Sequence, residues 1–189
     1  DEVQAVIGKP GVIFKLVESL FEENKTSKEN PSITQLISSN EKLMIEALDG
    51  KTHIAGAKNV FKSYIDSDFK NFGLNQPGLA TAETLVDVSA IVENATFTQI
   101  FTSITTDLDK LVLTQNQIIR FCEKHPTWLR QDGYGTFFLI KENNEYFVVS
   151  VYVYSNGLLV IVLRLVSFIV WFGVYRHRVV SPQLIPSYE

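Results

Sequence analysis

The sequence predicts an α+β fold in which a helical N-terminal two-thirds packs on a C-terminal four-stranded antiparallel β-meander. Two observations lead to this prediction. Apolar residues recur at helical spacing over much of residues 1–125. Residues 136–180 are instead rich in β-branched and aromatic residues, and short polar turns interrupt them, as is typical of strands. We expect a single domain over residues 1–189, with a loose tail at 181–189.

The helical prediction depends on amphipathic spacing and on end signals. The clearest helix begins at Thr114, where Thr-Gln-Asn-Gln forms a capping-box pattern, and ends at Pro126. Residues 32–48 have a weak centre, so a short helix followed by a strand at 43–48 is the alternative there. The segments expected to be helical are 12–23, 32–48, 53–65, 85–92, 97–104 and 114–124.

Four strands are expected after the joint at 128–135. Asn156-Gly157 is the strongest hairpin signal in the chain. The strands predicted around it are 136–141, 146–154, 158–165 and 169–180. The second and third are apolar at nearly every position, which predicts that both faces of the sheet are covered.

Residues 157–175 also have the length of a membrane-spanning helix and contain one charge, Arg164. A span at 157–175 is therefore an alternative, in which the protein is membrane-anchored. The sheet is favoured because the residues are β-branched and aromatic, and because an arginine near the bilayer centre costs about 2.5–3.5 kcal/mol.

Composition restricts the class of protein. The chain is 46% hydrophobic and 20% charged, which is enough to build a core. Its net charge of −4 disfavours a nucleic-acid binder. Residues 1–109 carry nine Lys and sixteen Asp or Glu, whereas residues 110–189 carry eight Lys or Arg and five Asp or Glu. The two halves thus attract each other, or an anionic ligand binds near the sheet.

A single cysteine, Cys122, excludes an internal disulfide and a cysteine-rich zinc site. We expect a buried core thiol in a cytoplasmic protein. The three histidines have no metal-ligand spacing, and P-loop, dinucleotide-binding and nucleophile-elbow motifs are absent. The sequence therefore predicts no metal site and no cofactor.

Two clusters are candidates for binding. Trp128, Arg130 and Tyr134 lie in the joint between helix and sheet, where loops often carry function. In the structural alternative, the aromatic residues anchor the core and Arg130 pairs with Asp132.

The second cluster is Arg176, His177 and Arg178. If the fourth strand is continuous here, the two arginines project to one face about 7 Å apart and form a clamp for a phosphate, a carboxylate or an acidic partner. In the structural alternative, they are a solvated edge that discourages aggregation.

From these residues we expect a soluble, non-catalytic binding module. Its contact surface is the seam between helices and sheet, or the exposed sheet face. Its partner is an unidentified protein or an anionic small molecule, and a homodimer through the sheet is one alternative. A second hypothesis is an enzyme acting on an anionic small molecule, with His177 or His125 as acid–base and the arginines as clamp.

Overall fold

The computed structural model describes residues 32–184. The helix expected at 12–23 and the end of the tail at 185–189 lie outside the described residues. The expectation of one domain over the whole chain stays a prediction for the same reason.

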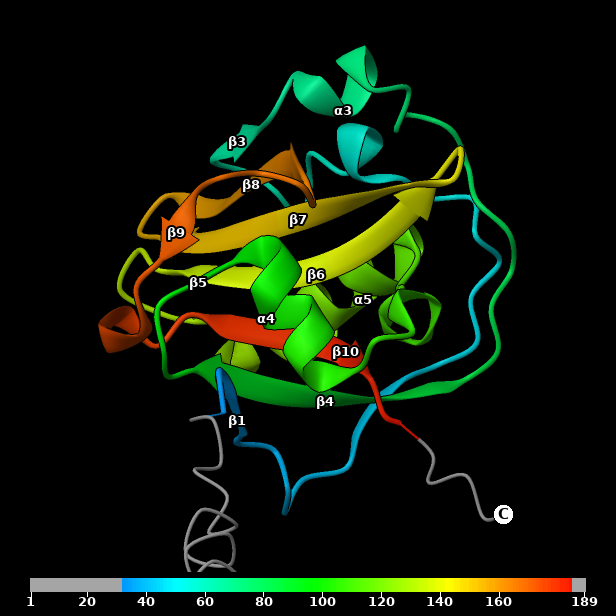
Figure 1. Cartoon of the computed structure of the whole chain (residues 1–189). Coiled ribbons are helices and arrows are strands. Elements are labelled where there is room, and N and C mark those ends of the chain that lie inside the picture. Colours follow the sequence, from blue (N-terminus) through cyan, green and yellow to red (C-terminus); the bar gives the residue numbers. More distant parts are fainter. Residues whose placement is uncertain (1–31, 185–189) are drawn as a thin grey trace, which may run out of the picture. The chain divides into compact units, whose positions relative to one another are not determined.

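An eight-stranded mixed sheet forms the centre of the described fold (Figure 1). Seven strands follow the order β1–β4–β10–β6–β7–β8–β3, and β2 also pairs with β4. The strands are β1 (Thr34–Leu36), β2 (Leu43–Ile45), β3 (Tyr64–Ile65), β4 (Thr84–Ile91), β6 (Gly135–Glu142), β7 (Glu145–Tyr154), β8 (Gly157–Arg164) and β10 (Arg178–Pro182). The predicted fold, a helical two-thirds on a four-stranded meander, is therefore wrong.

Three strands of the predicted meander are present. Strands β6, β7 and β8 pair antiparallel in sequence order. The first turn places Asn143 and Asn144 in the left-handed region, with φ of 49° and 61°. The second turn leads into Gly157 at φ 121°, a conformation that few residues other than glycine adopt. Both hairpins thus follow from local turn chemistry.

The predicted fourth strand, 169–180, is wrong. This part of the chain forms the short strand β9 (Val170–Trp171), the 3-10 turn η4 (Gly173–Tyr175) and strand β10. Arg176 separates η4 from β10 with a left-handed φ of 53°. Strand β10 does not pair with β8. It lies between β4 and β6, antiparallel to the first and parallel to the second. It also includes residues 181–182, which we expected in the loose tail.

The helix predicted at 85–92 is also wrong, because this segment is strand β4. Val86, Val88 and Ala90 are buried, whereas Asp87 and Ser89 between them are half-buried. This alternation has the period of a strand. The sequence prediction gave more weight to the possible helix start at residues 81–84 than to the β-branched residues that follow it.

Residues 53–65 are likewise not one helix. They form the 3-10 turn η1 (Ile54–Gly56), a loop and strand β3, which pairs parallel with β8. Residues 32–48 contain strands β1 and β2, so the helix predicted there is wrong. The strand alternative at 43–48 is confirmed for Leu43–Ile45.

Two predicted helices are confirmed, α4 (Phe97–Ile104) and α5 (Gln115–Lys124). Each begins with a complete capping box, formed by Thr96 with Gln99 and by Thr114 with Gln117. The described chain also contains the short helix α3 (Asp68–Asn71) and the 3-10 turns η2 (Leu108–Leu111) and η3 (Pro126–Trp128).

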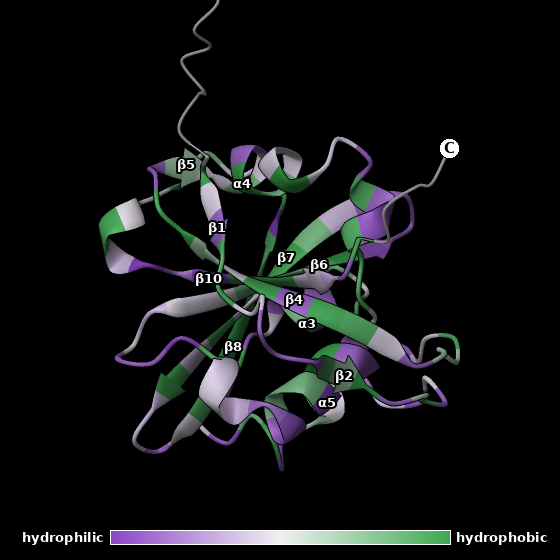
Figure 2. Cartoon of the chain, turned by 90° about the horizontal axis from the view of Figure 1, so that it is seen from below, coloured by the Kyte–Doolittle hydropathy of each residue, from purple (hydrophilic) through white to green (hydrophobic). Residues whose placement is uncertain are grey.

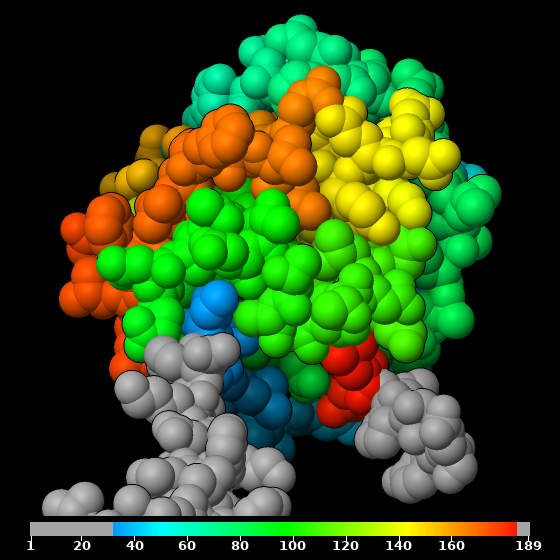
Figure 3. Space-filling view, in the orientation of Figure 1, coloured from blue at the N-terminus to red at the C-terminus, as the bar shows by residue number. Residues whose placement is uncertain are grey.

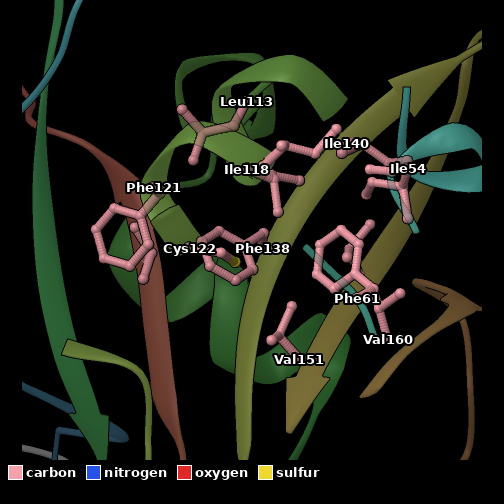
Figure 4. Packing of buried hydrophobic residues seen from close by; sticks show 14 of the residues in the cluster. Ile54, Phe61, Leu113, Ile118, Phe121, Cys122, Phe138, Ile140, Val151 and Val160 are labelled. Atoms are coloured by element: carbon pink, nitrogen blue, oxygen red, sulfur yellow. The ribbon is translucent and has the colours of Figure 1, made fainter. Parts of the chain in front are cut away.

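Both faces of the central strands are covered, as the sequence predicted. Phe138 and Val149 point to one face, where α5, η1 and α3 supply the opposing side chains (Figure 4). Phe137 and Val148 point to the other face, where α4, η2 and the segment around β9 pack. Figure 2 shows hydrophobic residues along the strands, with many hydrophilic residues in the surrounding loops and helices.

Residues 157–175 form two strands and a 3-10 turn, not one helix, so the span predicted as an alternative is not present as a helix. Arg164 is exposed at the end of β8, where it pairs with Glu145 and lies 4.9 Å from the ring centroid of Phe72. Across residues 32–184 the helices are all too short or too polar to cross a membrane.

Substitutions of two phenylalanines test which side chains belong to the core. Phe138 is fully buried on β6, whereas Phe168 is 97% exposed. We expect Phe138→Ala to lower the free energy of unfolding by about 3–5 kcal/mol, because it removes a large side chain and leaves a cavity. The matched change Phe168→Ala should lower it by less than about 0.5 kcal/mol. Chemical denaturation measures both, and equal losses would contradict this assignment of the core.

Candidate functional site

The most exposed apolar stretch of the described chain is residues 166–175, which we call the apolar segment. It connects β8 to β10 and lies on the surface beside α4 (orange beside green, Figure 3). Phe168 is 97% exposed, and Val174 is 79% exposed. The segment holds seven of the twelve exposed large hydrophobic side chains found within residues 32–184: Val166, Phe168, Ile169, Val170, Phe172, Val174 and Tyr175.

The apolar segment is held against the body of the protein at several points. Strand β9 pairs antiparallel with β5 (Ala95–Thr96), just before α4. The N–H of Gly173 donates to the side-chain oxygen of Asn94 at 3.0 Å. A Cβ at position 173 would lie 2.4 Å from the backbone carbon of Val92, so glycine permits this close approach. These contacts place the exposed side chains on a defined backbone.

One side chain of the segment, Trp171, points inward. Its ring lies 5.0 Å from that of Phe97 and 4.6 Å from that of Phe137, measured between centroids. Its indole N–H is buried and has no hydrogen-bond partner among the described residues. Trp171 therefore anchors the segment through apolar contact, while Phe168 and Phe172 on either side of it face solvent.

The joint that the sequence singled out lies next to the end of the apolar segment. The rings of Tyr134 and Tyr175 stack with their centroids 4.9 Å apart. The Arg130 guanidinium lies 5.0 Å from the centroid of Tyr134, and its Nε donates to the backbone oxygen of Tyr175 at 3.2 Å. Arg130 also pairs with Asp132 at 3.5 Å, as the structural alternative foresaw.

Arg178 connects the same joint to strand β10. Its guanidinium lies 5.8 Å from a ring centroid of Trp128. It donates to the backbone oxygens of Thr127 and Leu129 at 3.2 and 3.3 Å. These hydrogen bonds hold the turn η3 against the sheet, so Arg178 contributes to the stability of the fold.

Arg176 lies elsewhere. It precedes β10 in the left-handed conformation, so it does not share a strand face with Arg178 in the way that the clamp prediction required. Arg176 is exposed and donates to the side-chain oxygen of Gln35 at 3.3 Å. The structure thus brings together Trp128, Arg130, Tyr134, His177 and Arg178, and places Arg176 at their border.

His177 is buried at the centre of this group and is 5% exposed. Its ring stacks on Phe137 at 5.2 Å and meets Trp171 edge-on at 5.1 Å. Its Nδ1 accepts the N–H of Gly135 at 2.9 Å, which places the proton of the neutral ring on Nε2. Burial, with a smaller contribution from the charge of Arg130, lowers the pKa of His177 to about 4.

The other candidate residues are separate from this group. His125 contacts the backbone oxygen of Met44 through Nε2 at 3.0 Å. Cys122 is buried on α5, as predicted, and burial raises the pKa of its thiol. Residues 32–184 contain no group of three or more His, Cys, Asp or Glu side chains that could hold a metal ion.

Sequence reasoning did not predict that the side chains of the apolar segment are exposed. Phe172 and Val174 were assigned to the predicted fourth strand, in which apolar residues pack on the core, and Phe168 to the short gap before that strand. Ser167 and Gly173 are residue types typical of a break and a bend, and they are the signals in the sequence that this stretch leaves the sheet. Comparisons with models of protein families, with curated proteins and with solved structures found no match for this chain.

The buried ring of His177 makes stability depend on pH. Because its pKa is lower in the folded chain than the ordinary value of 6.5, the unfolded chain takes up the proton first. The stability from the neutral ring is complete above about pH 6.5 and is lost as pH falls toward 4. His177→Gln retains an acceptor for the Gly135 N–H and does not titrate.

We therefore expect the free energy of unfolding to fall more steeply between pH 7 and pH 4.5 for the unmodified chain than for His177→Gln. Urea denaturation at each pH measures the difference between the two proteins. A difference that stays constant across this range would show that His177 does not bind its proton differently in the two states.

Cys122 offers a separate measurement. Its buried thiol has a raised pKa, so little reactive thiolate is present in the folded protein. We expect an aromatic disulfide reagent to modify less than one thiol per chain over minutes in buffer, and one thiol at once in denaturant. Fast, complete modification under native conditions would place Cys122 at an accessible surface instead.

Proposed function

We propose that this protein is a non-catalytic interaction module that binds a partner protein through the apolar segment. The observation that carries the proposal is the concentration of seven exposed large hydrophobic side chains within ten residues. Single exposed hydrophobic residues are normal on protein surfaces, whereas contiguous groups mark places where another surface binds.

The residue types support a protein partner. Phenylalanine, tyrosine, tryptophan and arginine are enriched at the centres of protein interfaces. Phe168 and Phe172 provide the exposed aromatic area, and Tyr175 continues it to the stacked ring of Tyr134. Arg130 then lies over that ring at the border.

The backbone contacts of the apolar segment reduce the conformational entropy that would be lost when a partner binds. Its pairing with β5, the Asn94 hydrogen bond and the inward anchor of Trp171 already hold it in one conformation. Association loses free energy whenever loops and side chains must be ordered, so a segment that is ordered beforehand binds more tightly for the same area.

The charges at the border indicate the chemistry of the partner. Arg176 is exposed, and within residues 32–184 its guanidinium makes one hydrogen bond, to the side-chain oxygen of Gln35. Arg130 is paired with Asp132, whose side chain is 79% exposed. An apolar surface bordered by a carboxylate would complement Arg176 and would favour one orientation of the complex.

The enzyme hypothesis receives less support from this site. A general acid–base needs a pKa near the working pH and access to the substrate. His177 is buried, with a pKa of about 4, and Arg178 is bonded to backbone oxygens. The cytoplasmic location expected from the single cysteine remains part of the proposal.

The test begins with a photo-reactive phenylalanine analogue at position 168 in the full chain. A matched protein carries it at position 79, because Leu79 is 84% exposed but lies outside the segment. The proposal expects a partner protein to be cross-linked from position 168 and not from position 79. Mass spectrometry identifies this protein, which is then purified. Cross-linking that yields a second copy of this chain or lipid, or that is equal from both positions, would overturn it.

Affinity is then measured with the purified partner by calorimetry. We expect Phe168→Ala with Phe172→Ala to weaken binding by about 2 kcal/mol or more, roughly 30-fold, because each change removes an aromatic contact at the interface centre. Leu79→Ala should leave the affinity within about twofold of the unmodified chain. If the double variant binds as tightly as the unmodified chain, the apolar segment is not the interface.

A further inference from the structure

His177 lies beneath the apolar segment, between the sheet and a set of covering rings. On the sheet side its ring stacks on Phe137, which is fully buried on β6. On the other side the rings of Trp171, Tyr175 and Tyr134 meet it edge-on, with centroids 5.1, 6.1 and 5.7 Å away. Tyr175 is 42% exposed, so the covering side is nearer to water than the sheet side. Two of the three covering rings belong to the apolar segment.

The hydrogen bond at Nδ1 of His177 suits only the neutral ring. The N–H of Gly135 donates to this nitrogen at 2.9 Å, so Nδ1 must keep its lone pair. In the imidazolium both ring nitrogens carry a proton and neither can accept. Gly135 is fixed at the start of β6, where it pairs with Tyr152 on β7. Protonation therefore breaks this bond, and the ring has to move rather than Gly135.

The charged groups around His177 do not stabilise an imidazolium. The titratable or charged residues that lie on the segments around the ring, or beside it in the chain, are Glu93, Arg130, Asp132, Tyr134, Tyr152, Tyr175, Arg176 and Arg178. Of the two carboxylates, Asp132 is paired with Arg130 at 3.5 Å, and Glu93 is exposed. Burial, with a smaller contribution from the charge of Arg130, holds the pKa of His177 at about 4.

The other elements near the ring supply no counter-charge. Helix α4, which packs against Trp171 through Phe97, contains no titratable residue. Strands β4 and β6 contact His177 through Ile91 and Phe137. Their own titratable residues lie four or more positions away along each strand, and these are Asp87, Lys141 and Glu142. A protonated ring therefore has to reach water to be stabilised.

Few contacts attach the apolar segment to the sheet. Strand β9 contributes two residues to its pairing with β5, whereas β10 pairs with β4 through five residues. The indole N–H of Trp171 is buried without a partner among the described residues, which reduces the net gain from burying this ring. The segment can thus separate from the protein while the pairing of β10 is retained.

We propose that protonation of His177 releases the apolar segment from the sheet, so that acidification opens this surface while the sheet stays folded. The imidazolium reaches water on its more exposed side, where Trp171 and Tyr175 have to move away. The proposal concerns the apolar segment itself and holds whether or not a partner protein binds there.

The pH range follows from the ring in its two environments. In the open segment the ring titrates near its ordinary pKa of 6.5, and in the closed segment near 4. The closed segment is therefore fully stable above pH 6.5 and loses stability as pH falls toward 4. Between pH 7 and pH 5 the ratio of open to closed segments should increase about 20-fold.

Native-state hydrogen exchange of the full, nitrogen-15-labelled chain tests the proposal. The reporters are the N–H of Gly173, bonded to Asn94, and the N–H of Tyr175, bonded to the backbone oxygen of Phe172. After correction for the intrinsic exchange rate at each pH, their protection should fall about 20-fold between pH 7 and pH 5. Low urea should accelerate exchange in β6 and β7 but not at these two amides, because local opening exposes little surface. Exchange of these amides with the same urea dependence as β6 and β7 would show that the release is not local.

His177→Gln is the decisive variant, because glutamine retains an acceptor for the Gly135 N–H and does not titrate. Its two reporter amides should have nearly the same protection at pH 7 and at pH 5. His125→Gln is the matched control, since this histidine contacts the backbone oxygen of Met44 outside the group, and it should show the full loss. A loss in His177→Gln as large as in the unmodified chain would overturn the proposal.

The unmodified chain supplies a second measurement that needs no variant. Because opening takes up one proton, the protection of the Gly173 and Tyr175 amides should fall by nearly tenfold per pH unit around pH 5. Protection that is independent of pH between 6.5 and 4.5 would overturn the proposal even if His177→Gln did not fold.

Discussion

Strand β10 joins the two parts of the sheet, because it pairs antiparallel with β4 on one side and parallel with β6 on the other. A parallel pair cannot be closed by a tight hairpin and needs a longer connection. The chain therefore has to leave β8, which lies between β7 and β3, and return to the centre of the sheet. The residues that make this return include the apolar segment, so the exposed surface follows from the position of one strand.

The same strand assembles the group around His177. The register that sets Arg178 beside Thr136 also sets the joint at 126–134 beside residues 175–178. Tyr134 then stacks on Tyr175, and Arg178 reaches the backbone of η3. The arginines of the group are hydrogen-bonded to backbone oxygens, so they stabilise the fold as well as bordering the apolar segment.

Parts of the fold and of the site were predictable from local sequence. The hairpin at Asn156-Gly157 and the capping box at Thr114 depend on neighbouring residues alone, and both are present. The sequence identified Trp128, Arg130 and Tyr134, because a polar connection between a helix and a strand is easily recognised in a sequence. The exposure of Phe168 was not predictable, because an apolar residue on a strand and one on a surface connection look alike in a single sequence.

The sequence by itself determined that residues 135–164 form an antiparallel hairpin series with two apolar faces, and that α5 begins at its capping box. Alternation and turn residues encode these features over a few positions. Only the tertiary structure decided that 84–91 is a strand and that β10 lies between β4 and β6. Pairing over 40 or more residues depends on which apolar faces meet, and no local pattern specifies that choice.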